Sequence, residues 1–343
     1  MKAALFREFG GPEVLRQEDV PTPEPRPGHV LIRVLATGIN RLEVFLRQGA
    51  VTRDLALPHV LGSDAAGEIA EVGAGVTGFT RGERVVPMPG YPLDDADADF
   101  NPMSAAPSYA IGGIVKWGTY AQYVEVPAHW VLKDRTGLTP SQMATLPMVT
   151  VTGVRAVKTV GGVKAGDHVL IQAGASGTGS FGIQFARALG AKVATTVDAD
   201  DKAELAGGLG AELVIDVRKR DFVKDVQDWT GGRGVDVTID NLGGSILQRS
   251  MDATRVGGTI VTMGFVTGNE ATFKVREFFF AHKTLRGTLM GDVADFQFGL
   301  DLIAKKKIRP ILDREFALEN AAQAHEAVGS NKVLGNVVLL PWA

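Results

Sequence analysis

The sequence predicts an α/β protein with two domains, one mostly β and the other a doubly wound parallel sheet inserted into the first. Three observations support this fold class. The chain has 343 residues, more than one domain usually holds, and 45% of them are hydrophobic. Short strands between turns give way near Asp167 to strands that alternate with helices. A glycine-rich turn, residues 174–179, joins a strand to a helix in the second part.

Short β-branched runs separated by Gly and Pro fill the first part of the chain, up to about residue 130. This pattern is typical of a β-barrel-like domain. Strands are expected there at residues 30–35, 68–72, 84–87 and 120–126.

The second part has the alternation of strands and helices that a parallel sheet with right-handed crossovers requires. The expected strands are 168–171, 192–197, 213–215, 235–239, 259–263 and 284–289, and the expected helices are 181–189, 202–209, 221–229, 245–254 and 296–305. The tail, 332–340, is β-rich with no helix after it, so we expect it to return to the first domain. The mostly β domain is thus predicted to hold residues 1–130 and 296–343, and the inserted domain residues 131–295.

Charge and cysteine content exclude several classes of function. The 36 Lys and Arg residues nearly balance 39 Asp and Glu residues, so no nucleic acid or membrane partner is expected. The chain has no cysteine, which excludes disulfides, thiolate nucleophiles and any zinc site built on Cys. The six histidines lack the spacing of metal ligands, so no metal site is expected. Without a signal-like start or about 18 consecutive apolar residues, the expected location is cytoplasmic.

The glycine-rich turn carries the strongest chemical signal. Glycines in this place allow a tight turn, close approach of the backbone to a pyrophosphate and close packing of the helix on the strand. The N–H groups at the start of the helix then face the phosphate charge. We therefore predict a dinucleotide-binding site formed by Gly174, Ala175, Ser176, Gly177, Thr178 and Gly179.

An acidic residue follows the next strand at the distance expected for a ribose ligand. Asp198 lies 19 positions after Gly179, close to the spacing of about 20 at which a carboxylate accepts from the ribose diol. Because a carboxylate repels a 2′-phosphate, NAD(H) is the preferred cofactor. Lys202 and Arg218 follow nearby and either could reach a phosphate, so NADP(H) stays open.

Two further segments follow strands of the same expected sheet. Asn241 comes after the fourth strand, and Gly264 and Phe265 come after the fifth. Ligands of open α/β sheets bind at the carboxyl ends of the strands. We expect these three residues to line the nicotinamide side of the cofactor.

Several further segments match the signatures of a known family. They are residues 21–34, 36–40, 62–73, 82–85, 118–124 and 146–147 with Thr152. Over nearly its whole length the chain thus resembles the medium-chain dehydrogenase/reductase superfamily. The resemblance implies a GroES-like β-barrel catalytic domain with an inserted Rossmann domain, and it adds Thr152 to the cofactor-binding residues.

The resemblance also implies a chain without zinc. Zinc alcohol dehydrogenases of this superfamily have a cysteine ligand in place of Asn40, and Gly-His-Glu in place of Gly62, Ser63 and Asp64. Their structural-zinc lobe needs four cysteines, and the matching stretch 89–118 has none. The chain is similar to the zinc-free branch, the quinone oxidoreductases and related 2-alkenal and enoyl reductases. There an Asn contacts the nicotinamide region, so Asn40 is the candidate catalytic residue and a cofactor ligand.

The implied function is hydride transfer from NAD(P)H to a small hydrophobic electrophile, a quinone or an α,β-unsaturated carbonyl compound. Such acceptors are electron-poor and need no metal to polarise them. Three departures leave other functions open: Phe45 and Val217 replace tyrosines often found in the family, and Asp198 replaces a common Gly or Ser. The alternatives are a nucleotide-binding, redox-sensing or structural protein with little catalysis, and a zinc-independent alcohol dehydrogenase-like enzyme.

Three more groups of residues have two interpretations each. Glu43, Asp64 and Lys116 are candidate proton carriers or structural charges. The aromatic and sulfur-containing side chains of the 89–118 stretch form a lid over a flat substrate or pack onto their own domain; they are Tyr91, Met103, Tyr109 and Trp117. The last expected strand of the inserted sheet, 284–289, pairs with a second copy in oligomers of the superfamily, so a homodimer is expected, although an edge strand can equally be covered within one chain.

Overall fold

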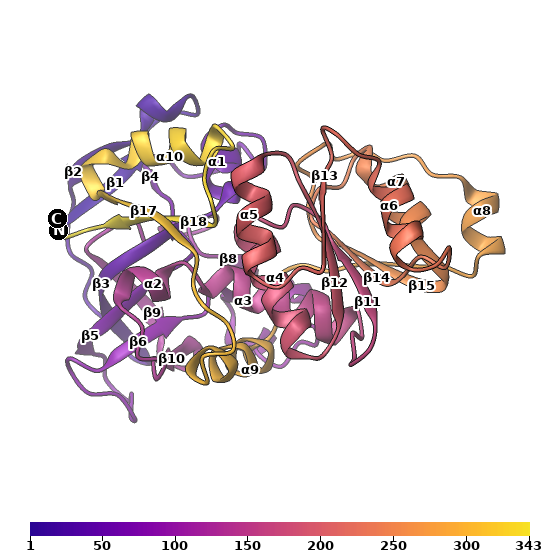
Figure 1. Cartoon of the computed structure of the whole chain (residues 1–343). Coiled ribbons are helices and arrows are strands. Elements are labelled where there is room, and N and C mark those ends of the chain that lie inside the picture. Colours follow the sequence, from indigo (N-terminus) through magenta and orange to yellow (C-terminus); the bar gives the residue numbers. More distant parts are fainter. The chain divides into compact units, whose positions relative to one another are not determined.

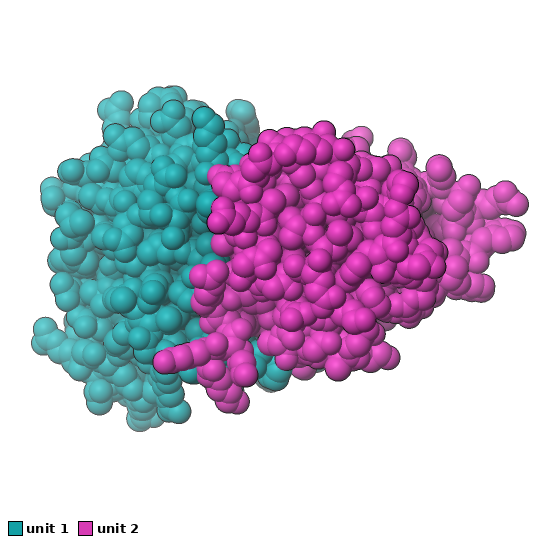
Figure 2. Space-filling model, viewed as in Figure 1, with its two compact units in different colours: residues 1–149, 292–304, 310–343 teal, residues 150–291, 305–309 magenta.

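The computed structural model describes residues 1–343 and divides them into two units, which Figure 2 shows in different colours. Unit 1 holds residues 1–149, 292–304 and 310–343, and unit 2 holds residues 150–291 and 305–309. The sequence places the first limit at residue 130 instead. Residues 131–149 stay with unit 1 because β10 (Val131–Lys133) is a strand of its sheet and α2 (Pro140–Ala144) packs on that sheet.

Unit 1 is built around β3 (His29–Ile39), the longest strand of the chain. β5 (Ala66–Val72) pairs antiparallel with one edge of β3 and places Ala66 opposite Ala36. The other edge is shared by β9 (Tyr123–Pro127) and β18 (Asn336–Leu340). The expectation that the tail returns to the first domain is therefore confirmed. The main sheet has the order β10-β6-β5-β3-β18-β17, with β6 at Arg84–Pro87 and β17 at Leu312–Ala317.

Smaller elements complete unit 1 (Figure 1). One three-stranded sheet contains β2 (Arg16–Asp19), β1 (Lys2–Phe6) and β4 (His59–Val60), and one two-stranded sheet contains β7 (Gly90–Pro92) and β8 (Tyr109–Ile111). Its helices are α1 (Arg41–Arg47), α2, α9 (Val293–Ala304) and α10 (Ala321–Gly329), and α3 (Pro147–Val154) runs across the limit between the units.

One apolar core holds α1, the first strands and the tail of the chain together. It contains Phe6, Leu46, Leu61, Tyr120 and Leu339, and none of these side chains is more than 1% exposed. The burial of Leu46 fixes α1, and with it the residue at its start, to the main sheet. Asn40 is that residue.

Unit 2 is a parallel sheet of six strands in the order β13-β12-β11-β14-β15-β16. The strands are β11 (His168–Ile171), β12 (Lys192–Val197), β13 (Leu213–Asp216), β14 (Val235–Asp240), β15 (Thr254–Thr262) and β16 (Thr284–Gly287). All six residues of β14 are buried, as the covering of both faces of a parallel sheet requires. The doubly wound arrangement is confirmed.

Helices cover both faces of this sheet. In Figure 1, α4 (Gly177–Ala188) and α5 (Asp200–Gly208) lie on one face, and α6 (Phe222–Trp229) and α7 (Ile246–Ala253) lie on the other. α8 (Val275–Phe280) comes just before β16. No helix of the chain is long and apolar enough to cross a membrane.

Most of the expected elements are present, with three informative differences. Residues 120–122 do not join the expected strand 120–126, because the backbone of Gly118, Thr119 and Tyr120 bonds to residues 60–62 instead. The helix expected at 181–189 begins four residues earlier, at Gly177. The helices α1, α2, α3, α8 and α10 were not among the expected elements, and neither were the strands β1, β2, β4, β7, β8, β10 and β17.

Candidate functional site

The glycine-rich turn of unit 2 lies at the carboxyl end of β11 and leads directly into α4. Ser176 caps the helix: its Oγ accepts from the N–H of Gly179 at 3.0 Å and donates to the carbonyl oxygen of Ala173 at 2.8 Å. The first N–H groups of a helix have no partner within it. The start of α4 can therefore bind an anion, as the sequence predicts.

Two glycines of the turn are required by close contacts. A Cβ on Gly174 would lie 2.3 Å from Oγ1 of Thr195 on β12. A Cβ on Gly179 would lie 2.1 Å from the carbonyl oxygen of Ala173, a residue that itself has a φ of 53°. A side chain at either position would push α4 away from the sheet.

Loops after two other strands lie beside this turn. Asn241 follows β14, and its Nδ2 lies 3.5 Å from Oγ of Ser176. The Oδ1 of Asn241 is buried and has no hydrogen-bond partner in the chain. Gly264, after β15, packs against Asn241 so closely that a Cβ would lie 2.1 Å from its carbonyl oxygen. A buried acceptor without a donor indicates a ligand group or a water at this place.

Asp198 follows β12, at the same edge of the sheet as the turn. Its Oδ1 accepts from Nζ of Lys202 at 2.7 Å. The Asp198 side chain is 46% exposed, whereas that of Lys202 is 11% exposed. The carboxylate is thus accessible to a ribose hydroxyl, and the lysine is directed at the carboxylate.

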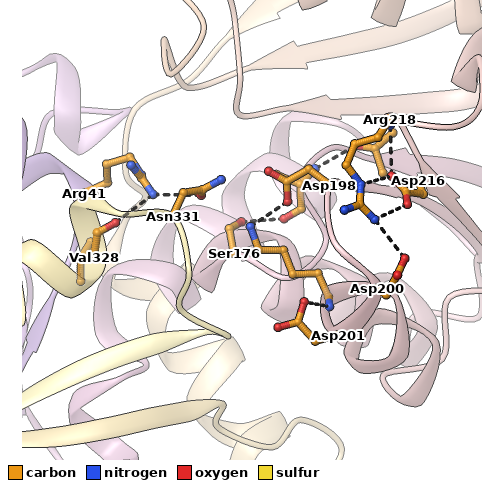
Figure 3. A network of polar contacts seen from close by, with 12 residues as sticks. Arg41, Ser176, Asp198, Asp200, Asp201, Asp216, Arg218, Val328 and Asn331 are labelled. Atoms are coloured by element: carbon orange, nitrogen blue, oxygen red, sulfur yellow. Dashed lines mark hydrogen bonds and ion pairs between the residues drawn. The ribbon is translucent and has the colours of Figure 1, made fainter.

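The cation that follows the third strand is also held by carboxylates. Figure 3 shows Arg218 directed at Asp216 and Asp200, with distances of 2.6 and 2.9 Å from Nη2. Hydrogen bonds from Arg218 hold the pKa of Asp216 well below its usual range. Arg218 therefore reaches a phosphate only after it releases these partners.

The two remaining predicted residues of unit 2 lie in different surroundings. Thr152 on α3 is partly buried, and its Oγ1 lies 3.8 Å from Sδ of Met290. Phe265 is 43% exposed on the loop after β15.

The glycine turn, the Asn241 acceptor and the Asp198 carboxylate fit a bound dinucleotide. The start of α4 would hold the pyrophosphate, and Asp198 would accept from the adenosine ribose. Asn241 would accept from a donor on the nicotinamide side. All three lie at the carboxyl edge of one parallel sheet.

Unit 1 has a polar cluster that we name the Asn40 cluster; its members are Asn40, Glu43, Ser63 and Asp64. Asn40 precedes α1, Glu43 lies in its first turn, and Ser63 and Asp64 precede β5. Nδ2 of Asn40 donates to Oγ of Ser63 at 3.3 Å and to Oδ2 of Asp64 at 3.0 Å. Oγ of Ser63 donates to Oε1 of Glu43 at 2.7 Å.

All four carboxylate oxygens of this cluster already accept hydrogen bonds. Oε2 of Glu43 accepts from the N–H of Asn40 at 2.8 Å, and Oε1 accepts from Ser63. Oδ1 of Asp64 accepts from the N–H of Met148 at 2.8 Å, and Oδ2 accepts from Asn40. No group of three or more His, Cys, Asp or Glu side chains lies together as metal ligands would.

Burial dominates the electrostatics of the Asn40 cluster. Glu43 and Asp64 are both 2% exposed. Burial raises the pKa of Glu43, and burial together with the charge of Glu43 raises the pKa of Asp64 to about 8. Asp64 is therefore not a solvated surface charge, and its proton can be exchanged near neutral pH.

The third candidate proton carrier lies elsewhere in unit 1. Nζ of Lys116 bonds to the hydroxyl of Tyr91 and lies 4.3 Å from the centre of its ring. Burial lowers the pKa of Lys116 to about 8. The amine is thus held against an aromatic residue of its own domain.

A lid of aromatic side chains was one of two interpretations of the 89–118 stretch, and most of these side chains are not at the surface. Tyr91 is 3% exposed and stacks on Trp130, and Met103 is 4% exposed. Trp117 is 39% exposed, but its Nε1 donates to the carbonyl oxygen of Pro58 at 3.1 Å. The alternative interpretation, packing onto the same domain, describes these residues better.

Sequence reasoning did not identify Ser63 as a bridge or Met148 as a backbone donor to Asp64. The matched segment 62–73 contains Ser63, but only the pairing of β3 with β5 brings it to α1. No sequence pattern predicts that the N–H of Met148 donates to Asp64.

Comparisons with known proteins agree with these features. The family model "Alcohol dehydrogenase GroES-like domain" matches residues 26–137, and "Zinc-binding dehydrogenase" matches residues 177–305. A 2-haloacrylate reductase of Burkholderia sp is 32% identical, over 99% of both chains. A quinone oxidoreductase of Rattus norvegicus is 31% identical, over 99% of this chain and 98% of its own. A crystal structure of an NAD-dependent alcohol dehydrogenase has a TM-score of 0.93 and 33% identity, covering 99% of both chains.

We expect Gly179→Ala to weaken NADH binding at least tenfold and to destabilise unit 2 by about 1–3 kcal/mol, the usual cost of overpacking. The added Cβ would meet the carbonyl oxygen of Ala173. Fluorescence titration with NADH and unfolding in urea measure the two effects.

Gly207→Ala is the matched control, because Gly207 lies in α5 and has no atom within 4 Å of the Cβ position. This variant should bind NADH as the parent does and be more stable by up to about 1 kcal/mol. If Gly179→Ala binds NADH as tightly as Gly207→Ala, the role given to the turn is wrong.

Proposed function

This chain belongs to the medium-chain dehydrogenase/reductase superfamily, in its quinone oxidoreductase-like branch, and we propose that it reduces a quinone or an α,β-unsaturated carbonyl compound with NAD(P)H, without a metal ion. The observation that carries the proposal is the Asn40 cluster. Asn40 donates hydrogen bonds to Ser63 and Asp64, and these residues stand where zinc enzymes of the superfamily have a cysteine ligand and the Gly-His-Glu triplet. Hydrogen bonds from within the chain already occupy the carboxylate oxygens of Glu43 and Asp64.

The chemistry suits acceptors that are already electron-poor. NAD(P)H, when bound, supplies a hydride to the acceptor, which also takes up one proton and becomes a hydroquinone or a saturated carbonyl compound. A simple ketone needs its oxygen polarised by a metal or a strong acid. The Asn40 cluster offers an amide and buried carboxyl groups, so the activated acceptors are the better substrates.

The residues of unit 2 have proposed roles in holding the cofactor. The turn Gly174, Ala175, Ser176, Gly177, Thr178 and Gly179 would bind the pyrophosphate. Asp198 would bind the adenosine ribose, and Lys202 would orient the Asp198 carboxylate. Asn241, Gly264 and Phe265 are proposed to border the nicotinamide, and Thr152 and Asn40 are proposed as further cofactor-binding residues.

Turnover assays test the proposed function. Purified protein with NADH or NADPH should reduce 1,4-naphthoquinone or a 2-alkenal, and it should oxidise a simple alcohol at least a hundredfold more slowly. Added zinc should leave the rate unchanged. Tight cofactor binding without turnover on any acceptor would favour a nucleotide-binding protein with little catalysis, and fast alcohol oxidation would favour the alcohol dehydrogenase-like function.

We propose NADH as the preferred donor, and Asp198→Ser tests this. Loss of the carboxylate removes the ribose acceptor and its repulsion of a 2′-phosphate, and it removes the hydrogen bond that Asp198 accepts from Lys202. The ratio of kcat/KM for NADPH to that for NADH should rise at least tenfold. Asp201→Ser is the control, because Asp201 lies in α5 and not at the end of β12. An unchanged ratio in Asp198→Ser would remove Asp198 from the ribose site.

We also propose a homodimer formed through the edge of unit 2. β16 pairs only with β15 and ends the sheet. Exposed apolar side chains accompany this edge; they include Phe279 at 56%, Phe280 at 65% and Leu289 at 51%. Such a surface is usually covered by a partner. Sedimentation should give twice the mass of the 36.4 kDa chain, and Phe280→Glu should shift the equilibrium toward monomers. A monomeric parent protein at micromolar concentration would contradict the proposal.

A further inference from the structure

We propose that Asp64 is a positioning residue that controls which end of the Asn40 carboxamide faces outward. Ionised Asp64 directs the carbonyl oxygen of Asn40 outward, and protonated Asp64 directs its amino group outward. This inference rests on the proposed function, in which Asn40 meets the bound nicotinamide and the acceptor.

The orientation with ionised Asp64 follows from the hydrogen bonds of the cluster. Ser63 gives its hydroxyl hydrogen to Glu43, so its Oγ can only accept from Asn40. An ionised Asp64 also can only accept. Both hydrogens of the Asn40 amino group are then directed inward, at 3.3 and 3.0 Å. Oδ1 lies at the start of α1 beside the N–H of Glu43, which also donates to the Asn40 backbone carbonyl, and it is the end of the carboxamide that a ligand can meet.

Protonation of Asp64 favours the opposite orientation of the Asn40 carboxamide. Oδ1 of Asp64 keeps the N–H of Met148, so the proton lies on Oδ2, which faces Asn40. A hydroxyl at that place donates, and the carboxamide satisfies it by turning its Oδ1 inward. The hydroxyl of Ser63 can rotate to the same Oδ1, while Glu43 keeps the N–H of Ser63. The amino group of Asn40 is then directed outward as a donor.

Asn40 is the most exposed member of this cluster. Glu43, Ser63 and Asp64 are each 2% exposed, whereas Asn40 is only partly buried. A ligand on the surface of unit 1 therefore meets the Asn40 carboxamide and not the carboxyl groups. The buried charge can act on the ligand through the orientation of that amide.

Burial and the neighbouring groups together set the pKa of Asp64. The groups that face it are Glu43 from α1, the N–H of Met148 from α3 and the phenol of Tyr120, whose own pKa is raised by burial and by both carboxyl groups. Thr37 of β3 and Thr119 bind the backbone carbonyl of Asp64 and not its carboxyl group. The hydroxyl of Tyr120 hydrogen-bonds with Nε2 of His325 at 3.1 Å, and the charge of Arg47 lowers the pKa of Tyr120. Burial raises the pKa of Asp64, the hydrogen bond from Asn40 opposes this, the charge of Glu43 adds to it and the N–H of Met148 opposes it, so the pKa is about 8.

The predicted consequence is a loss of activity at alkaline pH. Below the transition, the outward amino group of Asn40 donates to the carbonyl oxygen of a quinone or enone and stabilises the charge that hydride transfer places there. Above it, the outward oxygen repels the same atom. For NADH and 1,4-naphthoquinone, kcat/KM should fall about tenfold for each pH unit above about 8.

Asp64→Asn provides the decisive variant. Its Oδ1 can keep the N–H of Met148, and its amino group then faces Asn40 and holds it as protonated Asp64 does. The profile of kcat/KM should be flat from pH 6 to pH 10. An alkaline fall in Asp64→Asn equal to that of the parent would overturn the proposal.

Glu43→Gln is the matched control at the neighbouring carboxyl group. It removes the like charge that raises the pKa of Asp64 but leaves Asp64 able to titrate. The alkaline fall should persist and move to lower pH. A fall that stays at the parent's pH would contradict Asp64 as the titrating group.

Infrared difference spectra and unfolding test the inference without turnover. Between pH 6 and pH 10 the parent should lose the infrared band of a protonated carboxyl group and show a shift of an amide band. Asp64→Asn should not show the loss of the carboxyl band, and Asn40→Ala should not show the shift of the amide band. Because the folded pKa of Asp64 lies above its unfolded value, the free energy of unfolding should fall from about pH 4 to 8, and less steeply in Asp64→Asn.

These readings separate the two proposals. Both infrared changes without any turnover would support the orientation of Asn40 and reject the proposed enzyme. Turnover without a change in a carboxyl band of the parent would support the proposed enzyme function and overturn the role of Asp64. If Asp64→Asn does not fold, the infrared spectra of the parent and of Asn40→Ala still test the role of Asp64.

Discussion

The hydrogen bonding of β3 is the constraint on which unit 1 depends. Three strands from distant parts of the sequence, β5, β9 and β18, pair with this one strand. The register with β5 sets Ala66 opposite Ala36, and so brings the residues before β5 to the residues that follow β3. The contact of Asn40 with Asp64 is a consequence of that register, supported by the hydrogen bond from Thr37 to the carbonyl of Asp64.

Two carboxyl groups buried without a cation are costly for a fold, because burial removes their hydration and like charges repel. The chain lowers this cost by surrounding every carboxylate oxygen of Glu43 and Asp64 with an N–H or O–H donor. It does not remove the cost, which is why their pKa values are raised. Apolar residues of the same size would fill this space at a lower cost in folding free energy. Groups kept in such an environment are characteristic of functional sites, where local stability is given up for chemistry.

The sequence predicts the parallel sheet well and the Asn40 cluster poorly, for physical reasons. β-branched runs such as Lys192–Val197 end at glycine or acidic residues, so their limits are visible in the sequence. The glycine turn is predicted because its geometry needs glycine at Gly174 and Gly179, whatever surrounds it. Helices as short as α1 and α2 have too few turns for a periodic pattern, and they form because they pack on the sheet. The cluster joins residues more than twenty positions apart, and only the antiparallel register determines that they meet.

The return of β18 to β3 also bears on how the polypeptide acquires its fold while the ribosome makes it. The six strands of unit 2 lie in one continuous stretch, so that sheet can be completed before β18 is synthesised. The edge of β3 around Thr37 stays unpaired until Leu339 of β18 is translated, some three hundred residues later. In the meantime, the nascent chain presents an unpaired strand edge, the kind of surface that chaperones bind and that aggregates share. The codons of β18 therefore affect the folding yield of a domain that also contains β1 and β3.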